Sequence, residues 1–67
     1  MVDYYIISSN KAKLYSSPNI DSKCICELYK NSLIQVEFTE DDLWKKVKIN
    51  EDTYAYVSSM DVQLVGE

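Results

Sequence analysis

The sequence predicts an all-β fold, a small barrel or sandwich of short antiparallel strands, and three observations lead to it. Tyrosine, isoleucine and valine, which favour strands, dominate the periodic segments, and tyrosine alone occurs 6 times. Short polar runs separate these segments at the close spacing typical of small sandwiches and barrels. No segment keeps a helical period over the length that a helix needs. Closing the sheet into a barrel would also remove its exposed edges.

The predicted strands cover residues 4–7, 12–15, 23–29, 33–39, 43–49, 54–57 and 62–65, and one turn of tight helix is predicted at 58–61. The polar turns between them contain Asn10, Asn19, Asn31 and Asn50, whereas the only glycine is Gly66. Asparagine tolerates a positive φ better than most residues, so we expect it to replace glycine in these turns. Residues 1–67 are predicted to form one domain, because the chain shows no repeat or linker and is long enough for one small domain only.

Charge and composition exclude several classes of function. The net charge is −4, with 7 lysines and no arginine, whereas nucleic-acid binders carry a basic surface and use arginine to grip phosphate. We therefore expect no nucleic-acid partner, and anionic membranes and wall polymers are disfavoured for the same reason. No apolar run approaches the ~20 residues that span a bilayer, so no membrane association is expected.

The N-terminal segment lacks the basic region and the long apolar stretch of a signal peptide. Two alternatives follow, a cytoplasmic protein or a domain excised from a longer, secreted protein. The localisation stays open, with the cytoplasm slightly favoured unless the second alternative holds.

The residues of the chain form no recognisable catalytic set. There is no histidine, so Ser58 and Ser59 lack the commonest general base, and nothing places a carboxylate pair across a cleft. We expect no enzyme, no cofactor and no metal. Cys24 and Cys26 share one face of their strand, with Ile25 on the other, and are predicted to be buried free thiols; a redox or metal role is the alternative.

The segment that contains the only tryptophan alternates in polarity. Val47 and Ile49 are predicted to face the core, which places Trp44 on the face of the lysines. A following loop with an odd number of residues would pair Lys48 with Tyr54 and Lys46 with Tyr56. Ala55 and Val57 would then face the core.

The resulting outer stripe of Trp44, Tyr54 and Tyr56 has two interpretations. Either Tyr4 and Tyr5 or the loop with Tyr15 covers it, or lysine stems lie along its rings; alternatively, it is an exposed patch that binds a partner. Glu40, Asp41 and Asp42, just before Trp44, are either a solvated loop tip or a feature that favours a basic partner. The candidate ligand-binding residues are Trp44, Tyr54, Tyr56, Tyr15, Asp41 and Asp42.

The runs "AKLYSSPNIDSKCICELYKNSLIQVEF", "LWKKVKI" and "AYVSS" together resemble the bacterial SH3-like (SH3b) domain family, from Ala12 to Val62. That family carries a pattern close to L-N-V-R-S-G-P-S, then I-G-x-L, a K-G turn, V-x-V, W-x-K-V and G-W-V-S-S. Here Lys13 and Tyr15 replace the Asn and Arg of the first motif, and Asn31 replaces the turn Gly. The resemblance implies a small SH3-like barrel of short antiparallel strands.

The same resemblance implies a non-catalytic binding or targeting module. We expect it to recognise a peptide or protein partner, with self-association as a further option; the alternative is a cell-wall (peptidoglycan) targeting domain of a larger bacterial protein. The chain is also similar to eukaryotic SH3 domains, which bind proline-rich peptides. In that comparison Trp44 matches the groove tryptophan, while Ser58 and Asp61 stand in place of the groove proline and tyrosine.

Overall fold

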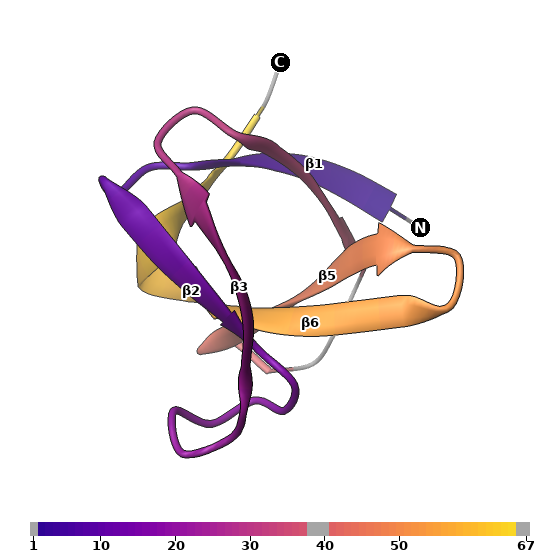
Figure 1. Cartoon of the computed structure of the whole chain (residues 1–67). Helices are drawn as coiled ribbons and strands as arrows, with labels where there is room; N and C mark the ends of the chain where they lie inside the picture. The colour runs from indigo at the N-terminus through magenta and orange to yellow at the C-terminus, as the bar shows by residue number, and fades with distance from the viewer. Residues whose placement is uncertain (1, 38–40, 66–67) are drawn as a thin grey trace.

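The computed structural model describes residues 2–37 and 41–65, and over these residues the fold is all-β (Figure 1). The elements are β1 (Val2–Ile7), β2 (Lys11–Tyr15), β3 (Cys24–Tyr29), β4 (Leu33–Glu37), β5 (Trp44–Asn50), β6 (Thr53–Ser58), the 3₁₀ turn η1 (Ser59–Asp61) and β7 (Val62–Leu64). The seven predicted strands and the tight turn are confirmed. The predicted end of the fourth strand, Thr39, lies outside the described residues.

The strands form one antiparallel sheet in the order β3-β2-β6-β5-β4-β1-β7. Three hairpins, β2–β3, β4–β5 and β5–β6, join neighbours in sequence, while β1 pairs with both β4 and β7. The single Tyr15–Tyr56 bridge links the β2–β3 hairpin to the rest of the sheet. The sheet is open over the described residues, with β3 and β7 at its two ends.

One hydrophobic core fills the concave side of this sheet. In Figure 1 β1 crosses the top of the molecule, the β5–β6 hairpin lies below it and extends to the right, and β2 with β3 lies on the left. A single sheet can bury one common core only by bending around it, so the strands wrap their inner faces around the same side chains. The buried core residues are Ile7, Ala12, Leu14, Ile34, Val36, Val47, Ala55, Val57 and Val62.

The β5–β6 hairpin has the predicted register. Lys48 pairs with Tyr54 and Lys46 with Tyr56, and Val47 lies on the core side, opposite Ala55. Ile49 lies beside Val47 in an apolar hollow that opens onto the core, but its side chain is 40% exposed and so is not fully buried. The register shifts between Lys48 and Asn50, so Ile49 is the extra residue of a bulge at the end of β5.

The burial predicted for the two cysteines is wrong for Cys24, which is exposed, while Cys26 is half-buried against the core. The ladder between β2 and β3 shifts after Leu14, so that Leu14 pairs with Cys26 but Tyr15 pairs with Cys24. This irregularity interrupts the alternation on which the prediction depended. Both cysteines are free thiols, and the Cys24 thiol donates to the carbonyl of Cys26 over 3.5 Å.

Asparagine residues shape the turns in two different ways, through the backbone or through the side chain. Asn31, in the turn between β3 and β4, has a φ of 76°, and it is the one non-glycine residue with positive φ in the described part of the chain. At Asn19 and Asn50 the side-chain oxygen instead accepts the backbone N–H two residues ahead, over 2.8 and 2.9 Å. These local hydrogen bonds stabilise a turn without a left-handed residue.

Candidate functional site

The outer face of β5 and β6 carries the aromatic and lysine side chains that alternation predicted. Trp44 pairs with Ser58 at the beginning of β5, followed along the hairpin by Lys46 with Tyr56 and Lys48 with Tyr54. All six of these side chains are half-buried. The stripe is therefore partly covered, and its aromatic side chains contact different parts of the chain.

Tyr15 packs against Trp44. The two ring centroids lie 5.9 Å apart with an interplanar angle of 85°, the edge-to-face geometry that aromatic pairs prefer. Tyr15 reaches this position because it ends β2, where it pairs with Tyr56 of β6. Of the proposed covers, Tyr5 lies elsewhere, under the ammonium group of Lys45 at 5.4 Å from the ring centroid.

The Tyr15–Trp44 pair forms one wall of a cleft of about 280 Å³. Its lining comes from β2, the loop that follows β2, the beginning of β5, the end of β6 and η1. Both polar and apolar groups converge there. The lining residues are Lys11, Lys13, Tyr15, Ile20, Trp44, Ser58 and Asp61.

The loop between β2 and β3 is ordered by its own side chains, and this ordering positions Ile20. The hydroxyl of Ser22 donates to the carbonyl of Asn19 over 2.7 Å, and the amide of Ser17 donates to the same hydroxyl over 3.3 Å. The Asn19 carboxamide closes the tip by accepting the amide of Asp21. Ile20, 72% exposed at this tip, therefore offers an apolar side chain at the rim of the cleft.

A second short turn also lines the cleft. Ser58 caps η1, because its hydroxyl accepts the amide of Met60 over 3.2 Å. The amide of Ser59 donates to the carbonyl of Leu43, the residue before Trp44, over 2.9 Å. These bonds hold Ser58 and Asp61 next to the tryptophan.

Tyr54 belongs to a different cluster. Its hydroxyl donates to the Glu37 carboxylate over 2.8 Å, and the Lys46 ammonium lies 4.4 Å from its ring centroid. The hydrogen bond to Glu37, with smaller contributions from burial and the Glu37 charge, raises the pKa of Tyr54 above its ordinary value. Tyr54 thus already has partners within the chain. This agrees with the alternative in which lysine side chains lie along the rings of the stripe.

Two of the six candidate residues, Tyr15 and Trp44, line the cleft, and four do not. Tyr54 and Tyr56 lie farther along the hairpin, and Asp41 and Asp42 are exposed in the segment before β5. The Asp41 carboxylate accepts the amide of Leu43 over 2.8 Å, so it helps to shape that segment. Glu40 lies outside the described residues.

Sequence reasoning missed five of the lining residues as candidates. For Lys11 and Lys13 a signal was present, because they alternate with buried Ala12 and Leu14 and so share the outer face with Tyr15. Ser58 and Asp61 stand where the comparison with eukaryotic SH3 domains had placed groove residues. For Ile20 the sequence offered no signal, because only the folded loop carries it to Trp44.

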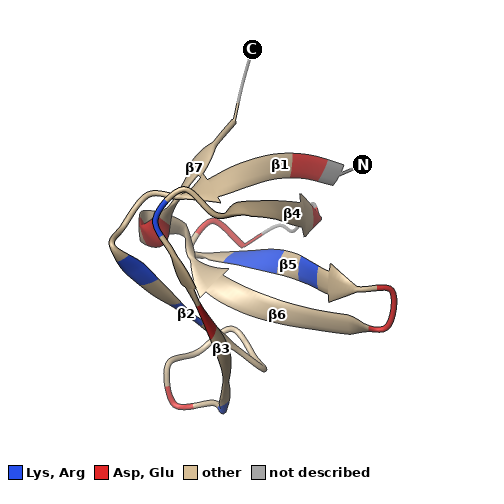
Figure 2. Cartoon of the chain, turned by 45° about the horizontal axis from the view of Figure 1, so that its top comes forward, with Lys and Arg blue, Asp and Glu red and all other residues tan. Residues whose placement is uncertain are grey.

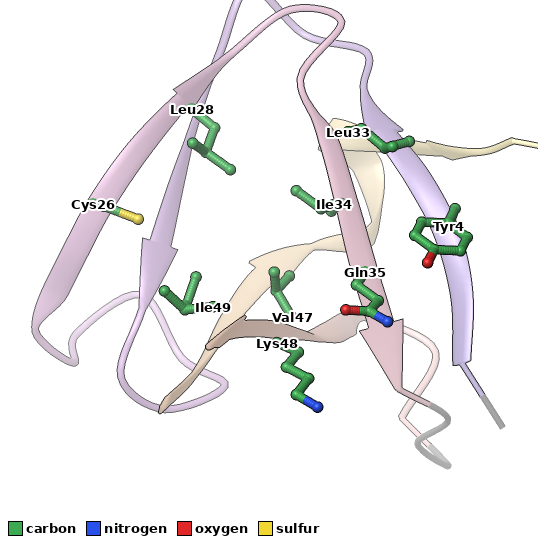
Figure 3. A pocket seen from close by; sticks show the side chains of 9 residues that line it. All are labelled: Tyr4, Cys26, Leu28, Leu33, Ile34, Gln35, Val47, Lys48 and Ile49. Carbon is green, nitrogen blue, oxygen red and sulfur yellow. The ribbon is translucent and has the colours of Figure 1, made fainter. Parts of the chain in front are cut away.

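A separate hollow of about 430 Å³ lies between β3, β4 and β5 (Figure 3). The side chains of Cys26, Leu28, Ile34 and Ile49 point into it from three sides, and buried Val47 lies at its base. Burial, followed by the nearby Cys24, raises the pKa of Cys26 above its ordinary value. The hollow is thus an apolar opening onto the core.

Charges are distributed unevenly over the surface (Figure 2). Lysines lie along β2 and β5, while acidic residues occupy the turn between β5 and β6. In the described ranges no group of three or more histidine, cysteine or acidic side chains is arranged to hold a metal ion. Nor does any helix of residues 2–37 and 41–65 have the length and apolar character to cross a membrane.

No family model, no curated protein and no solved structure matches this chain. The function is therefore inferred from the geometry of the site itself.

Proposed function

We propose that this chain is a non-catalytic binding module that recognises a peptide segment of a partner protein in the Tyr15–Trp44 cleft. The observation that carries the proposal is the edge-to-face contact of the two rings, 5.9 Å apart, at the wall of a cleft of about 280 Å³. Aromatic rings supply a large contact area at a low cost in conformational entropy, and tyrosine and tryptophan are enriched where proteins bind one another.

The other lining groups indicate what such a peptide would contain. Ile20 and the two rings suit one or two apolar side chains. Lys11 and Lys13 favour a carboxylate of the ligand, whereas Asp61 favours an amine or a guanidinium group. A short peptide with apolar side chains and charges of both signs fits this set of lining residues.

We also infer that the fold is an SH3-like barrel. The order of the motifs along the chain supports this assignment, as do the strongly bent sheet around one core and the tight turn just before the last strand. In the comparison with eukaryotic SH3 domains, Trp44 at the beginning of β5 matches the tryptophan of the ligand groove. Ser58 and Asp61 leave this groove less apolar than one that binds proline-rich peptides, so a polar peptide is the better ligand.

Selection from a random peptide library displayed on phage, with the immobilised chain as bait, tests this function. Enriched peptides are synthesised and titrated into the wild type and each variant by isothermal titration calorimetry, which does not depend on the fluorescence of Trp44. Tyr15→Ala and Trp44→Ala should each weaken binding by roughly tenfold or more, because truncating a central aromatic anchor costs about 2 kcal/mol. Tyr4→Ala, a half-exposed tyrosine of β1 outside the cleft, is the matched control and should bind like the wild type.

Two results would contradict the proposal. Enriched peptides that bind Trp44→Ala as well as the wild type would place the ligand elsewhere. A library without enriched peptides, together with Trp44-dependent retention on purified peptidoglycan, would replace the peptide ligand with the wall polymer.

A further inference from the structure

The hollow between β3, β4 and β5 lies where the sheet is interrupted (Figure 3). On the side of the hollow, the ladder between β4 and β5 ends at the pair of Val36 and Val47. In the same register the next pair would be Gln35 with Lys48, and this pair does not form. β3, on the third side, pairs with β2 and not with β4 over the described residues. No strand of that part of the chain therefore covers the opening.

The walls of the hollow are apolar, and its volume suits a small molecule. The side chains that point into it are Cys26, Leu28, Ile34 and Ile49, with Val47 at the base. Ile49 remains 40% exposed, so the fold itself leaves part of this wall in contact with water. The volume of about 430 Å³ lies within the range of roughly 300–1,000 Å³ typical of ligand pockets. An apolar ligand that covers these side chains would be bound by the hydrophobic effect.

The polar residues that line the hollow include a lysine but no acidic residue. They are Tyr4, Gln35 and Lys48. Gln35 extends from β4 and Lys48 from β5, at the mouth formed by the gap between these two strands (Figure 3). The Glu37 carboxylate of β4 instead accepts the hydrogen bond of the Tyr54 hydroxyl. Lys48 is half-buried, and within the described part of the chain its ammonium group has no ion-pair partner.

We propose that this hollow binds an alkyl carboxylate of medium chain length. The alkyl chain lies among the apolar side chains, and the carboxylate lies at the mouth, where it accepts a hydrogen bond from the Lys48 ammonium. The Gln35 carboxamide supplies a second donor on the other side of the gap. A hydrogen bond between an ammonium group and a carboxylate is stronger than one between neutral groups, so the head group adds both affinity and orientation.

The sign of the charge at the mouth selects among apolar ligands. A cationic amphiphile with the same chain would bring a second positive charge beside Lys48, and a neutral one would leave the ammonium group without an anionic partner. The hollow also differs from the Tyr15–Trp44 cleft, whose lining carries charges of both signs. The two sites share no lining residue, so this proposal does not depend on the proposed function.

Calorimetric titration of the full chain with hexanoate, octanoate and decanoate, each below its critical micelle concentration, tests the binding. Each step of two methylene groups should strengthen binding by roughly tenfold, because the added groups leave water. Decyltrimethylammonium has the same chain length as decanoate and the opposite charge, and it should bind at least roughly tenfold more weakly. Equal affinities for these two amphiphiles, or no binding of decanoate, would overturn the proposal.

Two variants test the roles of the mouth and of the walls. Lys48→Gln should weaken the binding of decanoate by roughly tenfold and remove the preference for the anion, because only the charge-assisted hydrogen bond is lost. Lys23→Gln removes the same charge from an exposed residue outside the lining and is the matched control, expected to bind like the wild type. Ile49→Trp fills the hollow from a half-exposed position and should abolish binding. A preference for decanoate that survives in Lys48→Gln would contradict the assigned head-group site.

The two cysteines report where the ligand lies. Cys26 points into the hollow, whereas Cys24 is exposed outside it. Saturating decanoate should therefore slow the reaction of Cys26 with iodoacetamide at least roughly fivefold in the wild type and leave Cys24 unchanged, since access governs thiol reactivity. In Ile49→Trp, decanoate should change neither rate. An unchanged rate at Cys26 in the wild type would place the ligand elsewhere. Faster reaction of both thiols, as denaturation by the amphiphile would cause, would also overturn the proposal.

Discussion

At the scale of single residues, Cys24 and Cys26 differ in accessibility although only Ile25 separates them. Cys24 is exposed, whereas Cys26 points into the apolar hollow and has a raised pKa. The thiolate is the reactive form of cysteine. The partial burial of Cys26 and its raised pKa therefore both slow its reaction. We expect iodoacetamide to modify Cys24 first in the native protein, as read from the fragment ions between the two cysteines in tandem mass spectrometry of the peptide that contains both. Equal rates for the two thiols in the native state would contradict this assignment, and equal rates in denaturant are the control.

The Tyr54–Glu37 hydrogen bond predicts a dependence of stability on alkaline pH. The pKa of Tyr54 is raised above its ordinary value of 10.0, so the folded state retains this proton at a pH where the unfolded chain has begun to lose it. The contribution is therefore fully present below about pH 10 and is lost as the pH rises through the folded pKa. In urea unfolding between about pH 9 and pH 11, the wild type should lose more stability than Tyr54→Phe. Parallel pH profiles would show that the hydrogen bond does not form.

At the scale of elements, the turn between β3 and β4 depends on the left-handed conformation of Asn31. Its amide donates to the carbonyl of Ile7 over 2.8 Å, so this turn also connects to β1. Asn31→Ala should lower the free energy of unfolding by about 1 kcal/mol, because a Cβ without a polar group disfavours positive φ. Asn31→Gly should preserve stability. Asn10→Ala, in another turn, is the control and should change little, and equal effects of the two alanines would disprove the role of φ.

At the scale of the whole molecule, stability depends on the one core shared by the strands around it. Val47 is 1% exposed in the middle of β5, between the hollow and the core. Val47→Ala should lower the free energy of unfolding by about 2 kcal/mol, measured by chemical denaturation. Val65→Ala removes the same two methyl groups from a side chain that is 46% exposed and should have a much smaller effect. Similar losses for both variants would mean that the hollow already leaves Val47 hydrated.

The sequence by itself determined the strands, the turns and the register of the β5–β6 hairpin. These features follow from local rules, because alternation assigns each residue to a face and the parity of a loop fixes which residues pair. Val47, Ala55 and Val57 were placed in the core on this basis. The same rules failed at Cys24, where a shift in the ladder interrupts the alternation.

Only the tertiary structure decided which aromatic residues lie together. Tyr15 and Trp44 are far apart in the sequence, and they meet because β2 pairs with β6 through one bridge at the end of β2. Ile20 joins them because hydrogen bonds within its loop turn the tip toward the cleft. Tyr54, on the same face, is instead held by Glu37 of β4. Alternation shows which side of a sheet a residue occupies, but the curvature of that sheet decides which residues of one side come into contact.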